Sequence, residues 1–76
     1  MNAQRRKEIK KVLEILADAS MEIQAILDEE EDALHNTPES LQGSENYDNM
    51  ERTASNLAEA ETYINEAVEQ LNESVE

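Results

Sequence analysis

Almost all of the side chains here that could do chemistry are carboxylates. Nineteen aspartates and glutamates stand against six lysines and arginines in 76 residues, with one histidine and no cysteine, and the formal net charge is −13. A single histidine is too few for the usual histidine-based nucleophilic sites, and no glycine-rich motif is present to cradle a phosphate. We therefore expect a non-enzymatic protein with no catalytic residues and no cofactor.

Asp32 and His35 form the one pair whose spacing resembles a metal-ligand pattern. They stand three residues apart, like the carboxylate and histidine ligands of di-iron helical bundles. Such a site also needs inward-facing glutamates from other helices, and Glu61 lies far along the chain from this pair. The acidic run at residues 28–32 lacks the glycine and the ligand spacing of an EF-hand. We expect no metal site and interpret His35 as a surface residue.

The charges are distributed unevenly. One base faces eighteen acids from residue 12 onward, and the other five bases are Arg5, Arg6, Lys7, Lys10 and Lys11. Such an acidic body repels nucleic acids and anionic membranes and attracts basic surfaces. The five consecutive acids at 28–32 approach a helix C-terminus, where negative charge opposes the helix dipole. A local rule broken in this way can indicate function, although a solvated helix end explains the run equally well.

The elements that must position these carboxylates are two long helices. The only proline, Pro38, and the only glycine, Gly43, fall within residues 35–44, and both flanks are free of helix breakers. Apolar residues recur at heptad spacing on both sides, which predicts a helix over about 3–34 and a second over about 45–74. The sequence thus predicts an all-α fold in which one domain, residues 1–76, forms an antiparallel helical hairpin about this hinge.

A two-helix hairpin offers only one layer of packing. We therefore predict a second layer from another chain, with two hairpins dimerising into a four-helix bundle. Ile15 and Met21 fall outside the main apolar stripe, and we interpret them as a second strip for a partner. The residues predicted for self-association are Ile9, Leu16, Ile23, Leu57, Ile64 and Leu71.

The start of the hinge has recognisable turn chemistry. Thr37 followed by Pro38 predicts a helix cap and the first residue of a short helical turn. Gly43 is expected in the left-handed conformation that ends this turn.

The end of the hinge leads into the second helix. Ser44 is expected to cap this helix, with Asp48 and Glu51 as a competing cap pair. Leu41 is expected to pack under the hinge as a plug.

The basic residues 5–11 are interpreted as partners of the opposite end of the chain. In an antiparallel hairpin they lie beside the C-terminal acids, and the two groups neutralise each other. These acids are Glu66, Glu69, Glu73 and Glu76. The alternative is a contact between the basic segment and nucleic acid, although no aromatic residue interleaves the bases.

The hinge sequence carries a resemblance to a known group of proteins. Residues 36–45, NTPESLQGSE, followed by Met50 and Glu51, resemble the N-x-P-E-S-L-Q-x-S-E hinge of small acidic helical-hairpin proteins of bacterial viruses and mobile elements. The resemblance covers about the middle half of the chain, and the second helix departs from the more regular versions through Tyr63 and several asparagines. Most such proteins have no assigned function, and some small acidic viral proteins inhibit host defence enzymes, including CRISPR nucleases.

The resemblance and the charge together favour a phage-type inhibitor of a host nucleic-acid-handling or defence protein, acting in the cytoplasm of a bacterial host cell. Regularly spaced carboxylates would mimic nucleic acid and bind a basic protein surface of the host enzyme. Two alternatives stay open: a structural coiled-coil or assembly protein that self-associates, and a small regulator that contacts nucleic acid through its basic N-terminus. The predicted partner-binding residues are Asp28, Glu29, Glu30, Glu31, Asp32, Glu39, Glu45, Asp48, Glu59 and Glu66.

Overall fold

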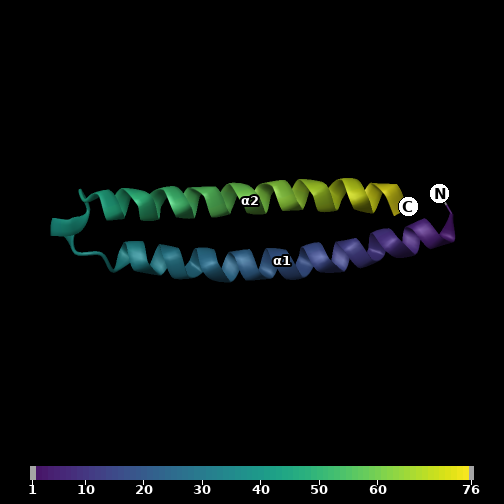
Figure 1. Ribbon diagram of the computed structural model, residues 1–76, viewed down its shortest axis with the longest axis horizontal. Helices are drawn as coiled ribbons and strands as arrows, with labels where there is room; N and C mark the ends of the chain where they lie inside the picture. Colours follow the sequence, from purple (N-terminus) through teal and green to yellow (C-terminus); the bar gives the residue numbers. More distant parts are fainter. Residues whose placement is uncertain (1, 76) are drawn as a thin grey trace.

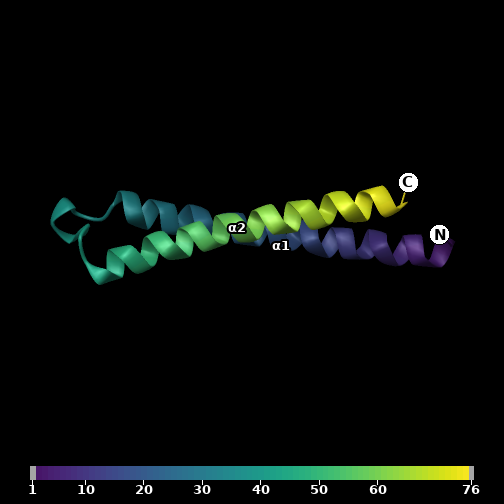
Figure 2. The ribbon, with the colours of Figure 1, turned by 90° about the horizontal axis from the view of Figure 1, so that it is seen from above.

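The protein is a thin helical rod. The computed structural model describes residues 2–75, in which helix α1 (Ala3–His35) and helix α2 (Glu45–Val75) run antiparallel (Figure 1). A short 3₁₀ turn, η1 (Glu39–Leu41), lies in the connection between them. The backbone spans 59 × 15 × 14 Å, and from above the helices cross at a shallow angle (Figure 2). The predicted helical hairpin is confirmed, with helix boundaries within one residue of the predicted ones.

The two helices meet along rows of half-buried residues that we call the contact rows. Along each helix the spacing alternates between three and four residues, which is the 3.5-residue period of a coiled coil. Within residues 2–75 no side chain is fully buried, because a single pair of helices leaves every contact residue open on its flanks. The contact rows are Ile9, Leu13, Leu16, Ser20, Ile23, Leu27, Glu30 and Leu34 on α1, and Tyr47, Met50, Ala54, Leu57, Glu61, Ile64, Val68, Leu71 and Val75 on α2.

A polar pair sits at the middle of these rows. The Ser20 hydroxyl lies 3.0 and 2.9 Å from the two carboxylate oxygens of Glu61 and donates its hydrogen bond there. This bond places the middle of α1 beside the middle of α2 and so fixes their register. Because the helices are antiparallel, seven residues before Ser20 on α1 correspond to seven residues after Glu61 on α2. Leu13 therefore lies near the level of Val68, and Leu27 lies near the level of Ala54.

Both helices begin at a side-chain cap. The Asn2 side chain accepts a hydrogen bond of 2.8 Å from the backbone N–H of Arg5, at the start of α1. At the start of α2, the Ser44 hydroxyl accepts one of 3.2 Å from the N–H of Tyr47. The prediction that Ser44 caps the second helix is confirmed, and the competing start at Asp48 is wrong because that residue lies within the first turn of α2.

Other predictions for the hinge are wrong. The Thr37 hydroxyl donates back to the carbonyl of Ala33 at 2.8 Å, and Pro38, with a ψ of 144°, takes the cap position of η1. Gly43 does not have a positive φ, because η1 passes through a turn into α2 without a left-handed residue. Leu41 is 53% exposed and does not form a buried plug, because no second layer of structure lies beyond the hinge.

Ile15 and Met21 do not form one strip. Their side chains are 65% and 71% exposed, as expected for residues outside the contact rows. At about 100° per residue, six residues of helix turn them roughly 120° apart, so they lie on different sides of α1.

Candidate protein-interaction surface

The strongest feature of the surface is a concentration of carboxylates at the hinge end of the rod. Between residues 28 and 52 the chain has nine acids and one base, Arg52. Eight of these acids are exposed and come from α1, η1 and α2, so the fold brings acids of three sequence segments to one end of the rod. We call them the hinge-end acidic patch: Asp28, Glu29, Glu31, Asp32, Glu39, Glu45, Asp48 and Glu51.

Glu30 differs from its neighbours in the acidic run. It occupies a contact row and is half-buried, while the acids on either side of it are exposed. Five consecutive helical residues span about 400° of rotation, so one of them must turn toward the other helix. The half-buried position of Glu30 therefore separates it from the hinge-end acidic patch, although the sequence placed all five acids together.

Two other predicted partner-binding residues also lie away from the patch. Glu59 and Glu66 are exposed and belong to a row spaced by seven residues on the side of α2 that faces away from α1. This row begins at Glu45, continues through Arg52 and ends at Glu73. Of the ten predicted residues, the fold therefore gathers seven into the patch and leaves Glu30, Glu59 and Glu66 outside it.

The opposite end of the rod has mixed charge. The start of α1 and the end of α2 lie at this terminal end (Figure 1), so basic residues 5–11 share it with Glu66, Glu69 and Glu73. Glu76, the fourth acid predicted there, lies outside the described residues. Bases and acids nearly balance at the terminal end, whereas the hinge end is strongly negative. The rod is thus electrically polarised along its length.

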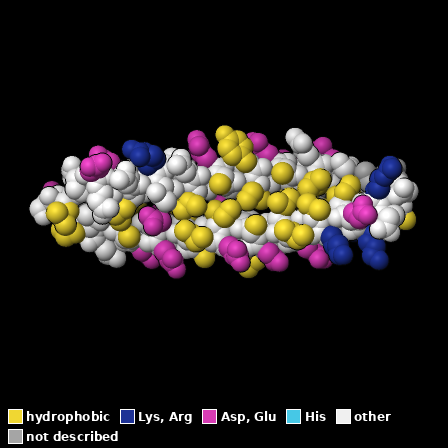
Figure 3. Space-filling view, in the orientation of Figure 1, with side chains coloured by type: hydrophobic (Ala, Val, Ile, Leu, Met, Phe, Trp, Pro, Cys, Tyr) yellow, Lys and Arg dark blue, Asp and Glu magenta, His cyan; other side chains and the backbone are white. Residues whose placement is uncertain are grey.

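One side of the rod carries almost no charge over its middle. On α1 a row of residues, each one position before a contact residue, reads Val12, Ala19, Ile26 and Ala33. The equivalent positions on α2 read Thr53, Ala60 and Ala67, and in an antiparallel pair these two rows flank the same side of the contact. Apolar side chains run along this side over both helices, with most charged groups at its edges (Figure 3).

We call this surface the uncharged face. It comprises the two rows and two exposed apolar residues that border them, Ile15 and Tyr63. Glu22 and Glu29 lie on the same border of α1 as Ile15. Four of its large side chains are well exposed: Val12 is 44% exposed, Ile26 48%, Ile15 65% and Tyr63 66%. The sequence interpretation missed this face because, apart from Ile15 and Met21, it read the apolar residues as a single stripe between the helices. The second seven-residue row beside that stripe was the signal that could have found it.

The predicted self-association residues border the uncharged face. Ile9, Leu16 and Ile23 on α1 occupy the contact row nearest to that face, and Leu57, Ile64 and Leu71 do so on α2. All six pack between the helices of one hairpin, and all remain partly exposed.

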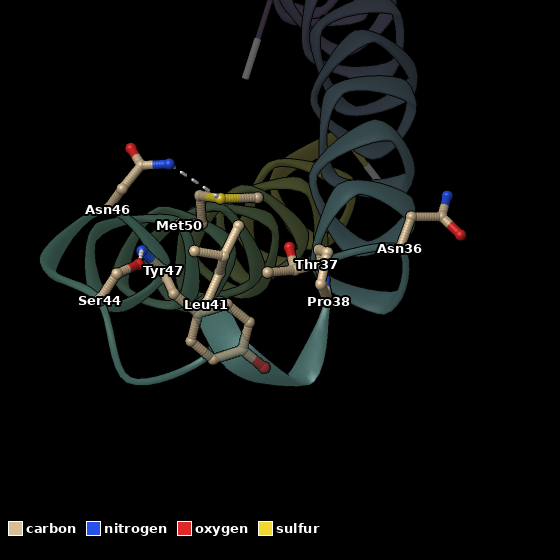
Figure 4. A pocket seen from close by; sticks show the side chains of 8 residues that line it. All are labelled: Asn36, Thr37, Pro38, Leu41, Ser44, Asn46, Tyr47 and Met50. Atoms are coloured by element: carbon tan, nitrogen blue, oxygen red, sulfur yellow. Dashed lines mark hydrogen bonds between the residues drawn. The ribbon is translucent and has the colours of Figure 1, made fainter.

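A shallow hollow of about 520 Å³ lies at the hinge. Its walls come from the connection, beginning at the α1 cap residue Asn36, and from the first turns of α2, and Leu41 and Met50 contribute apolar surface to it (Figure 4). Asn46 donates a weak hydrogen bond of 3.8 Å to the Met50 sulfur at its rim. The hollow is open, and its lining residues carry amide and hydroxyl groups but no charge.

The candidate metal ligands Asp32 and His35 are both exposed. In the described part of the chain, no three His, Cys, Asp or Glu side chains converge as metal ligands would. Over the same residues, neither helix has an apolar stretch long enough to cross a membrane. Comparison with known protein families, with curated proteins and with solved structures found no match to this chain.

Proposed function

We propose that this protein is a non-enzymatic binding module whose hinge-end acidic patch binds the basic surface of another protein. The observation that carries the proposal is the gathering of exposed carboxylates from α1, η1 and α2 at one end of the rod. Exposed charges held on rigid helices attract a basic surface and speed its association, and both effects weaken as salt is added. The uneven distribution matters, because acids needed only for solubility have no reason to concentrate at one end.

The partner we propose is a nucleic-acid-handling or defence enzyme of a bacterial host. A groove that binds phosphates is lined with lysine and arginine, and a rod with closely spaced carboxylates competes for it. The hinge motif that resembles proteins of bacterial viruses and mobile elements lies within the patch, at residues 36–45. The module would then act as an inhibitor by occupying the groove.

A pull-down from bacterial lysate tests this proposal. The bait is the full chain at low and at high salt, compared with the variant Glu29→Gln/Glu31→Gln/Asp32→Asn. The matched control, Glu14→Gln/Asp18→Asn/Glu22→Gln, removes three exposed acids of α1 that lie outside the patch. We expect a basic nucleic-acid-binding protein to be captured at low salt by the wild type and the control, and to be lost by the patch variant. Capture that survives neutralisation of the patch contradicts the proposal.

Two further outcomes separate the alternatives. If the captured enzyme still binds its DNA in the presence of the module, the module is a binding protein but not a groove competitor. A gel shift of DNA by the free protein at low salt would instead favour the regulator that contacts nucleic acid through residues 5–11.

We also propose that two hairpins associate into a four-helix bundle. The observation that favours it is the partial exposure of every apolar contact residue, because a single layer of packing leaves the core of this chain open. Sedimentation equilibrium tests this association directly. A dimer supports it, and a well-folded monomer at micromolar concentration contradicts it.

A further inference from the structure

The packing of two hairpins against each other rests on the self-association proposed above. We propose that the uncharged face binds the same face of a second copy, with the copies antiparallel. The hinge end of each copy then lies against the terminal end of the other, and the two-fold axis passes at Ala19. The occupant of the face is thus a second copy of this chain.

The composition of the face identifies it as the surface that is covered. One-third of the residues in this chain are charged, yet seven positions in two rows along the rod are alanine, valine, isoleucine or threonine. Alanines 19, 33, 60 and 67 let helix backbones approach closely, and the exposed Ile15, Ile26 and Tyr63 supply apolar area around them. The half-buried Ile9, Leu16, Ile23, Leu57, Ile64 and Leu71 lie between these rows and would complete the core.

The size of the face suits a dimer. From Val12 to Ala33 the row spans about 32 Å at ~1.5 Å per residue, and two helices side by side are roughly 20 Å wide. The product is about 600 Å² per copy, close to the ~800 Å² per partner of a stable interface. Apolar surface of this extent on a small protein is typical of an interaction site.

Two symmetric arrangements can bring the same face of two hairpins together. In the first, like ends meet, and each α1 lies over the α2 of the other copy. In the second, opposite ends meet, and each α1 lies antiparallel over the other α1. Charge decides between them. The first arrangement places two hinge-end acidic patches side by side, whereas the second places each patch beside the basic residues 5–11 of the other copy.

The sequence of α1 is balanced about Ala19 in the way the second arrangement requires. Ala19 is the central residue of Ala3–His35, so two copies of α1 crossing there overlap along their full length. Val12 and Ile26 stand seven residues on either side of it. Two-fold rotation at Ala19 therefore brings apolar residues of the face to apolar residues.

Substitution on opposite sides of α1 tests whether the face is the interface. Ile26→Glu places a charge on the uncharged face, seven residues from the two-fold axis, whereas Met21→Glu places the same charge on another side of the same helix, where Met21 is 71% exposed. We expect Ile26→Glu to raise the dimer dissociation constant at least tenfold with helix content unchanged, and Met21→Glu to change it less than twofold. Equal effects of the two substitutions would overturn the assignment of the face.

Cysteine crosslinking tests the antiparallel orientation, because the natural chain has no cysteine. We expect Ala19→Cys to form a disulfide-linked dimer on oxidation with diamide, since the two-fold axis brings that residue beside its own copy. Ala25→Cys, on the outer side of α1, is the matched control and should stay monomeric on a non-reducing gel. In the arrangement with like ends together, Ala19→Cys would instead link to Ala60→Cys when the two variants are mixed.

The outcomes separate the two levels of the proposal. A monomer in sedimentation contradicts self-association itself. A dimer whose Ala19→Cys variant does not crosslink to itself, but crosslinks to Ala60→Cys, leaves self-association intact and overturns the antiparallel orientation.

Discussion

The Ser20–Glu61 bond divides the rod into a terminal half and a hinge half. Both halves are pairs of antiparallel helices, but their side chains differ. On the terminal side of the Ser20–Glu61 bond the contact rows are wholly aliphatic. Leu16 is the contact residue of α1 that lies nearest to this bond on that side. On the hinge side they include Glu30, Ala54 and Tyr47, and the hinge-end acidic patch surrounds them. The half whose contact rows are wholly aliphatic is therefore not the half that displays the charge, although both halves contribute seven apolar contact residues.

The largest expected effect tests this division directly. Leu16→Ala in the terminal half should lower the free energy of unfolding by about 2 kcal/mol, the lower end for Leu→Ala because the side chain is only half-buried. Met50→Ala in the hinge half should cost about 1 kcal/mol, because its surroundings include Glu30 and the open hinge. Urea denaturation followed by circular dichroism, at one fixed protein concentration, measures both. A larger loss for Met50→Ala would reverse the comparison.

The boundary between the halves offers a second test. Ser20→Ala removes the hydroxyl that donates to the half-buried Glu61 carboxylate across the contact, and we expect a loss of about 1 kcal/mol. Ser55→Ala, at an exposed position of α2, is the matched control and should be neutral within about 0.5 kcal/mol. Adding Glu61→Leu to Ser20→Ala should recover the loss, because two apolar residues then meet. No loss in Ser20→Ala would show that the bond does not stabilise the register.

The caps at the two ends should respond differently. Ser44→Ala should cost about 1 kcal/mol, since α2 then starts with an unsatisfied N–H beside the hinge. Asn2→Ala should cost about 0.5 kcal/mol, because the first turn of α1 is exposed and can fray without disturbing α2. The same urea titrations measure the two values, and amide hydrogen exchange locates the loss. Equal costs at both caps would mean that the hinge does not couple α2 to α1.

The smallest expected effect has the opposite sign. Gly43→Ala should stabilise the protein by about 0.5 kcal/mol, because alanine reduces the freedom of the unfolded chain. Gly43 lacks a positive φ, and a Cβ added there would meet nothing within 4 Å, so the folded state accepts the change. The shift in the urea midpoint measures it. A destabilised variant would indicate that the hinge uses a left-handed glycine, as the sequence alone had predicted.

The sequence predicted the helices more accurately than the hinge, and the reason is physical. Heptad spacing accumulates over thirty residues, so the contacts of Ile9 or Leu71 could be read from their positions alone. The geometry of the hinge depends on single choices, such as the Thr37 hydroxyl bonding the Ala33 carbonyl in place of capping η1. Local residue preference does not decide between two such bonds when both are available.

The acidic surface could be predicted only in part. Residues 28–32 are adjacent in the sequence, but their addition to Glu45, Asp48 and Glu51 depends on how the hinge folds back. The uncharged face depends on two helices at once, because Ala19 and Ala60 become neighbours of one surface only in the antiparallel register set by Ser20 and Glu61. Properties that arise from two distant segments are harder to read than properties of one helix.

The polar residue Glu30 and the small Ala54 in the hinge half have a consequence for the order of folding. Contacts near the hinge close the shortest loop and therefore cost the least chain entropy, but Glu30 and Ala54 return little energy there. The contacts that repay the cost begin beyond them and bring together residues far apart in sequence, such as Leu16 and Ile64. We therefore expect the folding barrier to be crossed only after contacts between the helices, forming progressively from the hinge, extend past the Ser20–Glu61 bond. Substitutions in the terminal half should then mainly change the unfolding rate, and Leu27→Ala should mainly slow folding.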